Sequence, residues 1–597
     1  MPIQSKQSGV APLVPAQAPY AKLVMAAVVG SLCPTLSFAQ TTQEGDIVVT
    51  APLEGARLES LQGATVLNRD DIVETLNGGL GDTLDAQPGI TTTFFGAGAS
   101  RPIIRGLGDD RVRVLQNGIG AIDASSASPD HAVTADGLDA SRIEVLRGAA
   151  ALAYGGNAIG GVVNVLDESI PTRPADALSF EGLASYSSVD EGRQGFGAVT
   201  AGAGPFAFRL SAAGRETDDY DTPVGEAVNS WTSLRAYSAG GSLVGERGYA
   251  GLAIKRTEDD YGLPPEDPSE PGGHIELEQT RIEARGDVRI DAGPFTRLDF
   301  GVQHSDYEHT EFEGDGAPGT QFTSDGWEGR VEGHHGNRDD QLRGVVGLQY
   351  TDVDFAAEGD EAFITPTNTQ DIGVFVIERW DTGGWGLEGG ARFERREIDN
   401  QGAGSREFDN TSVSGGVFVR PAENWFVGAT LARTQRAPTA IELFADGPHL
   451  ATANYEIGDA ALDQETATSF EISARYDTGP VRLEANVYRV GFEDYIALVE
   501  RGDVFWLDET TETSGFAPDE SDPSIPADAE VLPVFIFTQQ DATFTGGEIS
   551  ARARLLRPAA SRFQAMFPTI SCAPSLMAVV IPSHTTPVAD GRTGRGE

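Results

Sequence analysis

Long segments in which apolar and polar residues alternate fill the chain after about residue 178. In residues 281–290, charged side chains occupy every second position, and apolar or small ones stand between them. Residues 206–212 and 481–488 repeat this pattern. Because successive side chains of a strand point to opposite faces, each segment has one apolar and one polar face. Over about ten residues this is typical of outer-membrane strands, which turn their apolar face to lipid and their polar face to a watery lumen.

Hydropathy and charge limit the folds that these predicted strands can form. The strands of a soluble β-sandwich also alternate, but there the apolar face is the buried one, and the charged face needs no watery lumen. The length of the strands favours a barrel over a sandwich. After the N-terminal region there is no run of about 18 apolar residues, so any membrane span has to be a closed β-barrel. The formal net charge of −47 argues against nucleic-acid binding, which needs a basic surface, and suits the capture of cations.

The N-terminus has the pattern of a secretory signal. Lys6 and Lys22 precede a largely apolar segment, residues 23–39, which ends in a small-x-small cleavage pattern. We expect residues 1–39 to be a signal peptide that is cut after Ala39. Its removal would leave Cys572 as the single cysteine, which excludes an internal disulfide and a cysteine-based metal site.

A glycine-rich unit, residues 143–165, stands between two apolar, β-branched runs. β-Branched residues suit strands, and glycine admits conformations and close approaches that other residues do not. The unit is therefore expected to be compact and to fit a confined space. Together with SRPIIRG at residues 100–106 and VLQNG at residues 114–118, it resembles the plug domain of TonB-dependent outer-membrane receptors.

This resemblance implies a mainly β fold: a transmembrane antiparallel β-barrel with an N-terminal α+β plug. The plug would span residues 53–170, with short helices near residues 70–74 and 80–84. The resemblance implies the following plug-motif residues: Arg105, Gly106, Arg147, Gly148, Gly155, Gly160 and Gly161.

A short β-prone segment precedes the predicted plug, within a predicted periplasmic extension at residues 40–52. It consists of Asp46, Ile47, Val48, Val49, Thr50 and Ala51. In a receptor of this family it resembles the TonB box, which an energy-coupling TonB-type protein captures by strand addition. Pro52 follows and would limit the length of that strand.

The predicted barrel covers residues 171–556, and we count roughly seventeen strand-like segments between Leu178 and Leu556. A barrel that holds a plug has about 22 strands. The alternation ends near Arg557, and residues 557–597 contain many prolines and no final aromatic strand. We interpret the barrel as incomplete and this tail as aberrant, the product of a frameshift or truncation. A natural periplasmic tail is the alternative.

Candidate cation ligands occur in the plug and in segments predicted to be long loops. They are Asp130 and His131 in SPDHA, His449 in GPHLAT, and Glu311 and Glu313 in HTEFEG. Any one of these side chains could simply be solvated, but imidazole and carboxylate together can make a four-coordinate zinc site. The first two motifs resemble the zinc-importing branch of the family. That resemblance implies Asp130, His131 and His449 as ligands, with Glu313 as the fourth and Glu311 as its rival.

Other histidines fit this pattern less well. The zinc-importing branch often carries a histidine-rich loop after Tyr-Gly-Leu-Pro, but here Tyr261 to Pro264 is followed by carboxylates and only His274 is nearby. His334 and His335 are adjacent in a predicted strand, so they would point to opposite faces.

The resemblance implies an active importer of the outer membrane, without a permanently bound cofactor. Its substrate would be zinc or a zinc complex, and the inner-membrane proton-motive force would drive it. A ferric-siderophore or haem receptor is the alternative. A passive porin predicts neither plug nor TonB box, and a hydrolase would need a nucleophile motif such as Gly-x-Ser-x-Gly, which we do not find.

Overall fold

The structure is a computed structural model and describes residues 47–553, apart from short gaps. The gaps are residues 49, 52, 54, 57–59, 62, 149–150, 176–177, 266–268, 270, 360–361, 450–451, 509–510 and 512. The predicted signal peptide, residues 1–39, and the predicted aberrant tail, residues 557–597, lie outside the described residues. Both the signal peptide and the aberrant tail therefore stay predictions.

The N-terminal part contains a five-stranded sheet with the order β3-β8-β9-β6-β7. Its elements are β3 (Ala64–Asn68), α1 (Arg69–Thr75), α2 (Leu80–Leu84), β6 (Val112–Gln116), β7 (Ile119–Gly120), β8 (Arg142–Arg147), α3 (Ala151–Tyr154) and β9 (Gly161–Leu166). β6 and β9 are parallel, and the other neighbours are antiparallel. Apolar side chains such as Ile72, Leu80, Ile143 and Val163 are fully buried in its core. Smaller pairs are β1 (Ile47–Val48) with β2 (Gly55–Ala56) and β4 (Ile90–Thr92) with β5 (Pro102–Ile104).

The glycine-rich unit lies where the chain is most crowded. Gly161 has a φ of +150°, and a Cβ there would lie 2.6 Å from the carbonyl oxygen of Leu146. A Cβ on Gly156 would lie 2.6 Å from the carbonyl oxygen of Gln435, which belongs to the surrounding sheet. Neither position leaves room for a side chain, so the glycines allow the plug to pack closely against itself and its surroundings.

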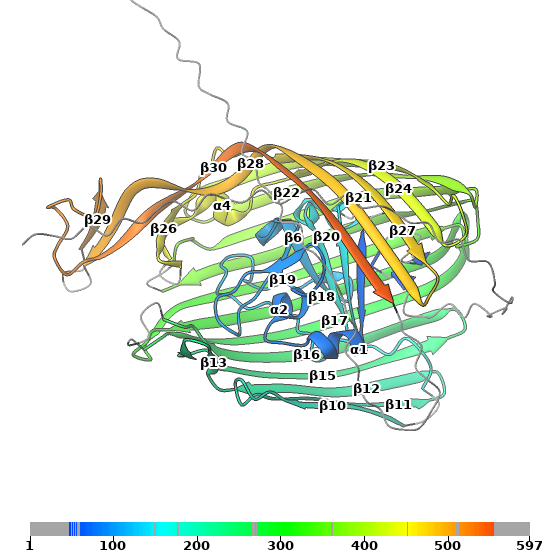
Figure 1. Ribbon diagram of the computed structural model, residues 1–597, viewed down its shortest axis with the longest axis horizontal. Coiled ribbons are helices and arrows are strands. Elements are labelled where there is room, and N and C mark those ends of the chain that lie inside the picture. Colours follow the sequence, from blue (N-terminus) through cyan, green and yellow to red (C-terminus); the bar gives the residue numbers. More distant parts are fainter. Residues whose placement is uncertain are drawn as a thin grey trace, which may run out of the picture. The chain divides into compact units, whose positions relative to one another are not determined.

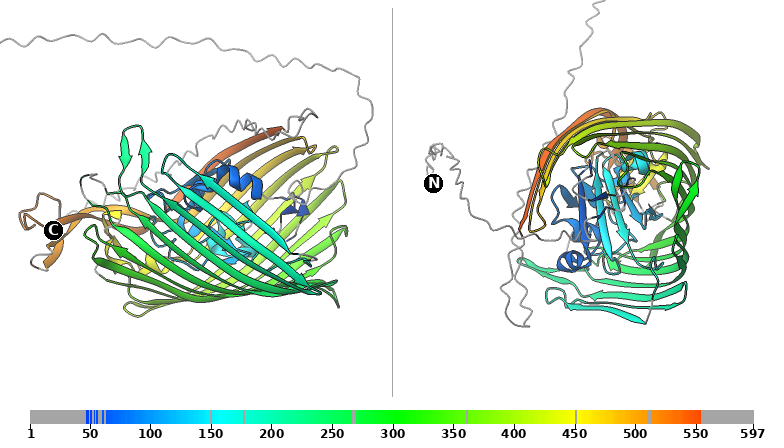
Figure 2. Two further views of the ribbon diagram at one scale, coloured as in Figure 1. Left: turned by 90° about the horizontal axis from the view of Figure 1, so that it is seen from below. Right: turned by 90° about the vertical axis from the view of Figure 1, so that its right-hand side faces the viewer.

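The C-terminal part is one large sheet of nineteen strands that curves around the plug (Figure 1 and Figure 2). In sheet order the strands are β10 (Ser179–Tyr186), β11 (Arg193–Ala203), β12 (Phe206–Thr217), β15 (Thr232–Gly245), β16 (Gly248–Gly262), β17 (His274–Ala292), β18 (Phe295–Phe312), β19 (Pro318–His335), β20 (Leu342–Glu358), β21 (Thr367–Asp381), β22 (Trp385–Asn400), β23 (Gly404–Val419), β24 (Trp425–Arg436), β25 (Asp446–His449), β26 (Asn454–Ile457), β27 (Glu465–Asp477), β28 (Val481–Asp508), β29 (Thr513–Ala517) and β30 (Glu530–Ala553).

The strands of this sheet are antiparallel, except that β26 runs parallel to β30. β25, β26 and β29 are only four or five residues long and lie in connections between longer strands. One connection also holds the helix α4 (Ala440–Phe444), and another holds the pair β13 (Tyr220–Thr222) and β14 (Gly225–Ala227). In the part of the chain that the structure describes, no pairing joins β10 to β30, so these strands end the sheet order.

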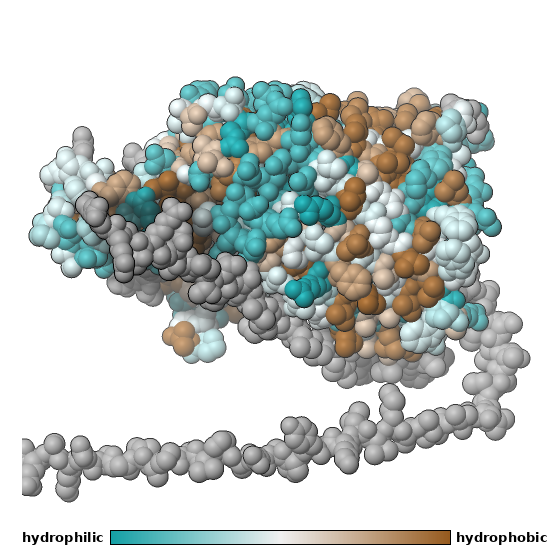
Figure 3. Space-filling view, turned by 90° about the horizontal axis from the view of Figure 1, so that it is seen from above, coloured by the Kyte–Doolittle hydropathy of each residue, from teal (hydrophilic) through white to brown (hydrophobic). Residues whose placement is uncertain are grey.

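The predicted alternation agrees with the two faces of the sheet. On β17, Ile282 is 49% exposed on the outer face, whereas its neighbours Arg281 and Glu283 are buried on the inner face. Leu252 and Val487 are likewise exposed on other strands. Figure 3 shows brown, apolar areas on one face of the outer surface. None of the helices among the described residues is long and apolar enough to cross a membrane.

The two ends of the sheet differ in the length of their connections. At one end the connections are short, for example residues 246–247, 293–294 and 336–341. At the other end they are long, for example residues 263–273 and 437–464. In outer-membrane barrels the short turns face the periplasm and the long loops face the exterior. The end of the sheet with the short connections therefore corresponds to the periplasmic end of such a barrel.

Buried ion pairs join the plug to the inner face of the sheet. Arg105 of the plug lies between Glu471 on β27 and Glu548 on β30, with N–O distances of 2.8 Å to each. Arg111 contacts Glu465 on β27 at 2.6 Å. Because these charges are removed from water, each of them depends on its partner.

Replacement of Arg105 by alanine should therefore loosen the plug. It leaves Glu471 buried without this cation and Glu548 with the more distant Arg147, at 3.8 Å, and loss of one partner of a buried pair costs about 3–5 kcal/mol. Hydrogen exchange of the full chain in detergent micelles should show amide protection in β8 and β9 reduced about 100-fold or more. Arg256→Ala is the control, because its ion pairs with Glu258 and Glu278 are half exposed. Equal protection in both variants would contradict a clamping role for Arg105.

Candidate metal centre

His131 is the plug's contribution to a compact group of ligand-type side chains. It lies in the loop between β7 and β8, and its side chain is fully buried. The ring Nδ1 is hydrogen-bonded to the carbonyl oxygen of Ala124 at 3.0 Å, which fixes the orientation of the ring. Its other nitrogen, Nε2, lies 3.0 Å from Oε1 of Glu311.

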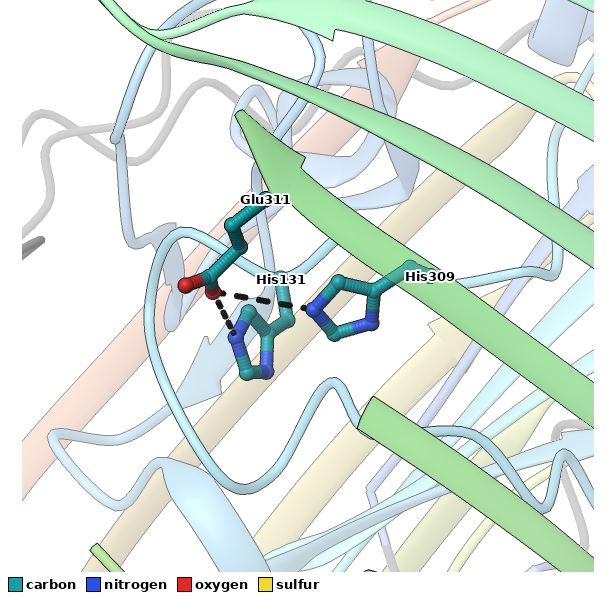
Figure 4. Close-up of side chains that lie close together, drawn as sticks. All are labelled: His131, His309 and Glu311. Atoms are coloured by element: carbon teal, nitrogen blue, oxygen red, sulfur yellow. Dashed lines mark hydrogen bonds and ion pairs between the residues drawn. The ribbon is translucent and has the colours of Figure 1, made fainter. Parts of the chain in front are cut away.

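The sheet contributes His309 and Glu311, which both lie near the C-terminal end of β18. The two residues are separated by one position, so both side chains point to the inner face. His309 Nε2 lies 3.6 Å from Glu311 Oε1, and His309 Nδ1 is hydrogen-bonded to the Tyr307 hydroxyl at 2.7 Å. The ligand atoms of His131, His309 and Glu311 all lie within 4.8 Å of one another (Figure 4). Two imidazoles and a carboxylate at this spacing can converge on one ion.

Asp130 lies beside His131 of this triad, and His449 is within electrostatic reach of Asp130 and His131. Asp130 is fully buried, and its Oδ2 lies 3.8 Å from His131 Nε2. His449, on β25, stacks on Phe363, and its Nδ1 lies 3.3 Å from Glu456 Oε1. Within the described residues, neither Oδ2 of Asp130 nor Nε2 of His449 has a hydrogen-bond partner. Each therefore offers a buried ligand atom that no hydrogen bond uses.

Aromatic side chains enclose the group. The ring of Phe322 lies 4.8 Å from the rings of both His131 and His309. The Tyr261 hydroxyl donates to the carbonyl oxygen of Asp130 at 2.8 Å and accepts from the Ala132 amide at 2.9 Å. These contacts hold the Asp130–His131 loop against the sheet. Because the aromatic rings exclude water, charges inside the group interact strongly.

The proton on His131 competes with any metal ion. Burial disfavours the protonated ring, but the neighbouring Asp130 carboxylate and the hydrogen bond to Glu311 outweigh this effect and raise the pKa of His131 to about 9. Metal-free His131 is therefore protonated at neutral pH, and a bound cation has to displace that proton.

The other residues predicted from the sequence lie apart from the triad. Glu313 follows the end of β18 and is exposed, and its amide donates to Ala317 in a turn. The structure thus brings Glu311, the rival choice, next to His131, and it places Glu311 on a strand rather than in a loop. His274 stacks on Phe312 and lies 3.8 Å from Glu276. His309 was not among the ligands predicted from the sequence, although His309-Thr310-Glu311 has the spacing of two ligands on one strand face.

The segment predicted to be the TonB box is partly described and packs against the plug. Val48 and Thr50 are buried. The Thr50 amide donates to Glu144 at 2.7 Å, and its carbonyl oxygen accepts from the Tyr154 hydroxyl at 2.7 Å. Its hydroxyl accepts from Asn164 at 2.9 Å. Asp46 and Val49 of the segment lie outside the described residues.

Two family models match the sequence. The model of the TonB dependent receptor-like beta-barrel matches residues 207–567, which is more than half of the chain. The model of the TonB-dependent receptor plug domain matches residues 56–162. A curated relative, the vitamin B12 transporter BtuB of Vibrio vulnificus (strain CMCP6), is 29% identical over 206 residues, or 34% of this chain. The chain spans only 33% of the length of that relative in this match.

Several solved structures resemble this one. The copper transporter OprC has a TM-score of 0.67 at 15% identity, with 86% of this chain and 78% of that chain covered. The Serratia marcescens hemophore receptor HasR, in complex with its hemophore HasA and heme, has a TM-score of 0.67 at 13% identity, with 83% and 80% covered. The FrpB iron transporter from Neisseria meningitidis has a TM-score of 0.64 at 15% identity, with 84% and 78% covered. These likenesses show the fold, and the predicted fold class is confirmed.

The raised pKa of His131 predicts how cation binding depends on pH. Between pH 6.5 and 8.5 the proton and the cation compete for His131, so apparent affinity should rise by up to about tenfold per pH unit and level off near the pKa of about 9. Calorimetry in buffers of different ionisation enthalpy measures both the affinity and the proton released. Affinity that stays constant over this range, with no proton release, would show that His131 is not a ligand.

Proposed function

Since the chain belongs to the TonB-dependent receptor family of the outer membrane, we propose that it imports a divalent metal cation, zinc in the first instance. The observation that carries this proposal is the buried triad of His131 from the plug and His309 and Glu311 from the sheet. A ligand held between plug and barrel can couple its own binding to a movement of the plug.

The donor set supports zinc. Two imidazoles and a carboxylate, without a thiolate, match the ligands that zinc takes in four-coordinate sites. Asp130 or His449 can complete the coordination, since each has a buried atom without a hydrogen-bond partner in the described chain. Imidazole ligands also suit copper, and copper outranks zinc in affinity at a given nitrogen and oxygen site. Competition between the two ions has to be measured.

The size of the group favours a bare ion over a large chelate. Its ligand atoms lie within 4.8 Å of one another, and Phe322 and Tyr307 pack closely against them. A haem, a corrinoid or a ferric siderophore would need these contacts to open. The names of several similar proteins refer to such ligands, so a siderophore or haem receptor remains the second candidate.

Energy coupling is proposed to act through residues 46–51 as a TonB box. A TonB-type protein would pair with this segment by strand addition and so pull on the plug. The contacts of Thr50 with Glu144, Tyr154 and Asn164 would have to break in that step. Residues 1–39, proposed as a signal peptide, would direct the chain to export.

A matched pair of glutamate variants tests the site. Glu311→Gln removes the carboxylate that touches both histidines, so zinc affinity should fall about 100-fold or more, because even outer-shell partners of metal ligands are worth 10–100-fold. Glu313→Gln removes an exposed charge two positions later and should change affinity little. Competition with a chromophoric chelator, using full-length protein in detergent, measures both. Equal affinities in the two variants would rule out the triad as the site.

A measurement of zinc uptake by cells separates zinc binding from energy coupling through the proposed TonB box. Val48→Pro removes a backbone donor from the proposed TonB box, so strand addition should fail. Cells that express this variant should lose accumulation of radioactive zinc, while the purified variant keeps its zinc affinity. Wild-type accumulation by Val48→Pro cells would contradict the role of residues 46–51.

A further inference from the structure

A second group of ligand-type side chains lies at the opposite end of the sheet, near the short turns. Asp299 is on β18, and Glu332 and His334 are on the adjacent strand β19. Asp299 pairs directly with Glu332 in the antiparallel register, and His334 lies two positions further along, so it shares the inner face. The ligand atoms of the three side chains lie within 4.8 Å of one another.

The Nε2 atom of His334 has three polar neighbours, one of which is the Nη2 atom of Arg297 at 3.3 Å. His334 Nε2 lies 2.9 Å from Asp299 Oδ2 and 3.4 Å from Glu332 Oε2. A single N–H cannot point well at both carboxylates. The second oxygen of Asp299, Oδ1, is buried and has no hydrogen-bond partner among the described residues. An ion in place of the proton on Nε2 can contact all three side chains.

Two arginines limit the negative charge of the group. Arg297 donates to Asp299 Oδ2 at 2.8 Å, and Arg330 pairs with Glu332 Oε1. These guanidinium groups hold the carboxylates in place, and their two positive charges formally balance the two carboxylate charges. We therefore expect the group to bind a cation more weakly than the buried triad, whose ion pairs within the described part of the chain involve no arginine.

The group also differs from the buried triad in its access to open space. Asp299, Glu332 and His334 line a cavity of about 1450 Å³ between the plug and the sheet. Thr50 and Ala51 of the proposed TonB box line the same cavity, as does Tyr154 of the plug. The group is thus on the periplasmic side of the plug and next to the segment on which the coupling protein would pull.

We propose that Asp299, Glu332 and His334 form a second divalent-cation site, which an imported ion occupies after it has passed the plug. Binding at this site does not depend on the proposed function. Its place as the exit site rests on that function. The other reading is a static network of ion pairs with Arg297 and Arg330, which predicts no metal binding.

Titration of the full-length protein in detergent with Co²⁺, followed by its visible absorption, tests the proposal. The wild type should bind two ions, one tightly and one more weakly. His334→Gln should lose the weaker ion alone. His335→Gln is the matched control, because the neighbouring ring instead contacts Glu378 at 2.9 Å, and it should keep both ions. Circular dichroism establishes that each variant is folded.

The outcomes separate this site from the buried triad. Glu311→Gln should lose the tight ion and keep the weaker one, so failure of the proposed import site and failure of the second site give different stoichiometries. If folded His334→Gln binds cobalt with the stoichiometry of the wild type, the second site does not exist. If the wild type binds only the ion that Glu311→Gln removes, the ion-pair network is the correct reading.

Discussion

The ion pairs between the plug and the inner face of the sheet are the interaction on which the rest of this structure depends. Arg105 is held by two glutamates from different strands, and its guanidinium also lies 4.2 Å from the ring of Tyr488. Arg111 repeats the arrangement with Glu465 and Tyr495. Removing such charges from water is costly, so they stabilise only one position of the plug, the position in which every charge has its partner. That position brings His131 against β18.

The two proposed cation sites differ in how they are placed relative to the plug. The buried triad lies at the contact between plug and sheet, so an ion bound there would join two bodies that the coupling protein has to separate. The second group belongs to the sheet alone and faces the cavity beside Thr50. Movement of the plug would therefore disrupt the first site and leave the second intact. An ion could then pass from a tight closed site to a weaker open one.

Much of the fold was predictable because its signals are local. The alternation in residues 281–290 identifies an inner and an outer face without knowledge of neighbouring strands, and the structure places Arg281 and Ile282 accordingly. The short helices expected near residues 70–74 and 80–84 occur as α1 and α2. The close packing of the plug was predictable for a similar reason, since the glycines that allow it are visible in the sequence itself.

The candidate site was only partly predictable because it depends on where a strand ends and on contacts across the plug boundary. From the sequence, the segment around Glu311 is predicted to be a loop, in which Glu311 and Glu313 are equivalent candidates. In the structure β18 continues to Phe312, so His309 and Glu311 share the inner face and Glu313 lies beyond it. The group around His334 depends on strand register, because Asp299 is 33 positions from Glu332 in sequence but directly opposite it in the sheet.

The most direct test of the central claim is anomalous X-ray diffraction from crystals of the full-length protein that have been loaded with one equivalent of zinc. The proposed role of the triad as the import site predicts one strong anomalous peak within coordination distance, about 2.0–2.2 Å, of His131, His309 and Glu311. A peak that touches none of these three side chains, or no zinc in the space between plug and sheet, would contradict it.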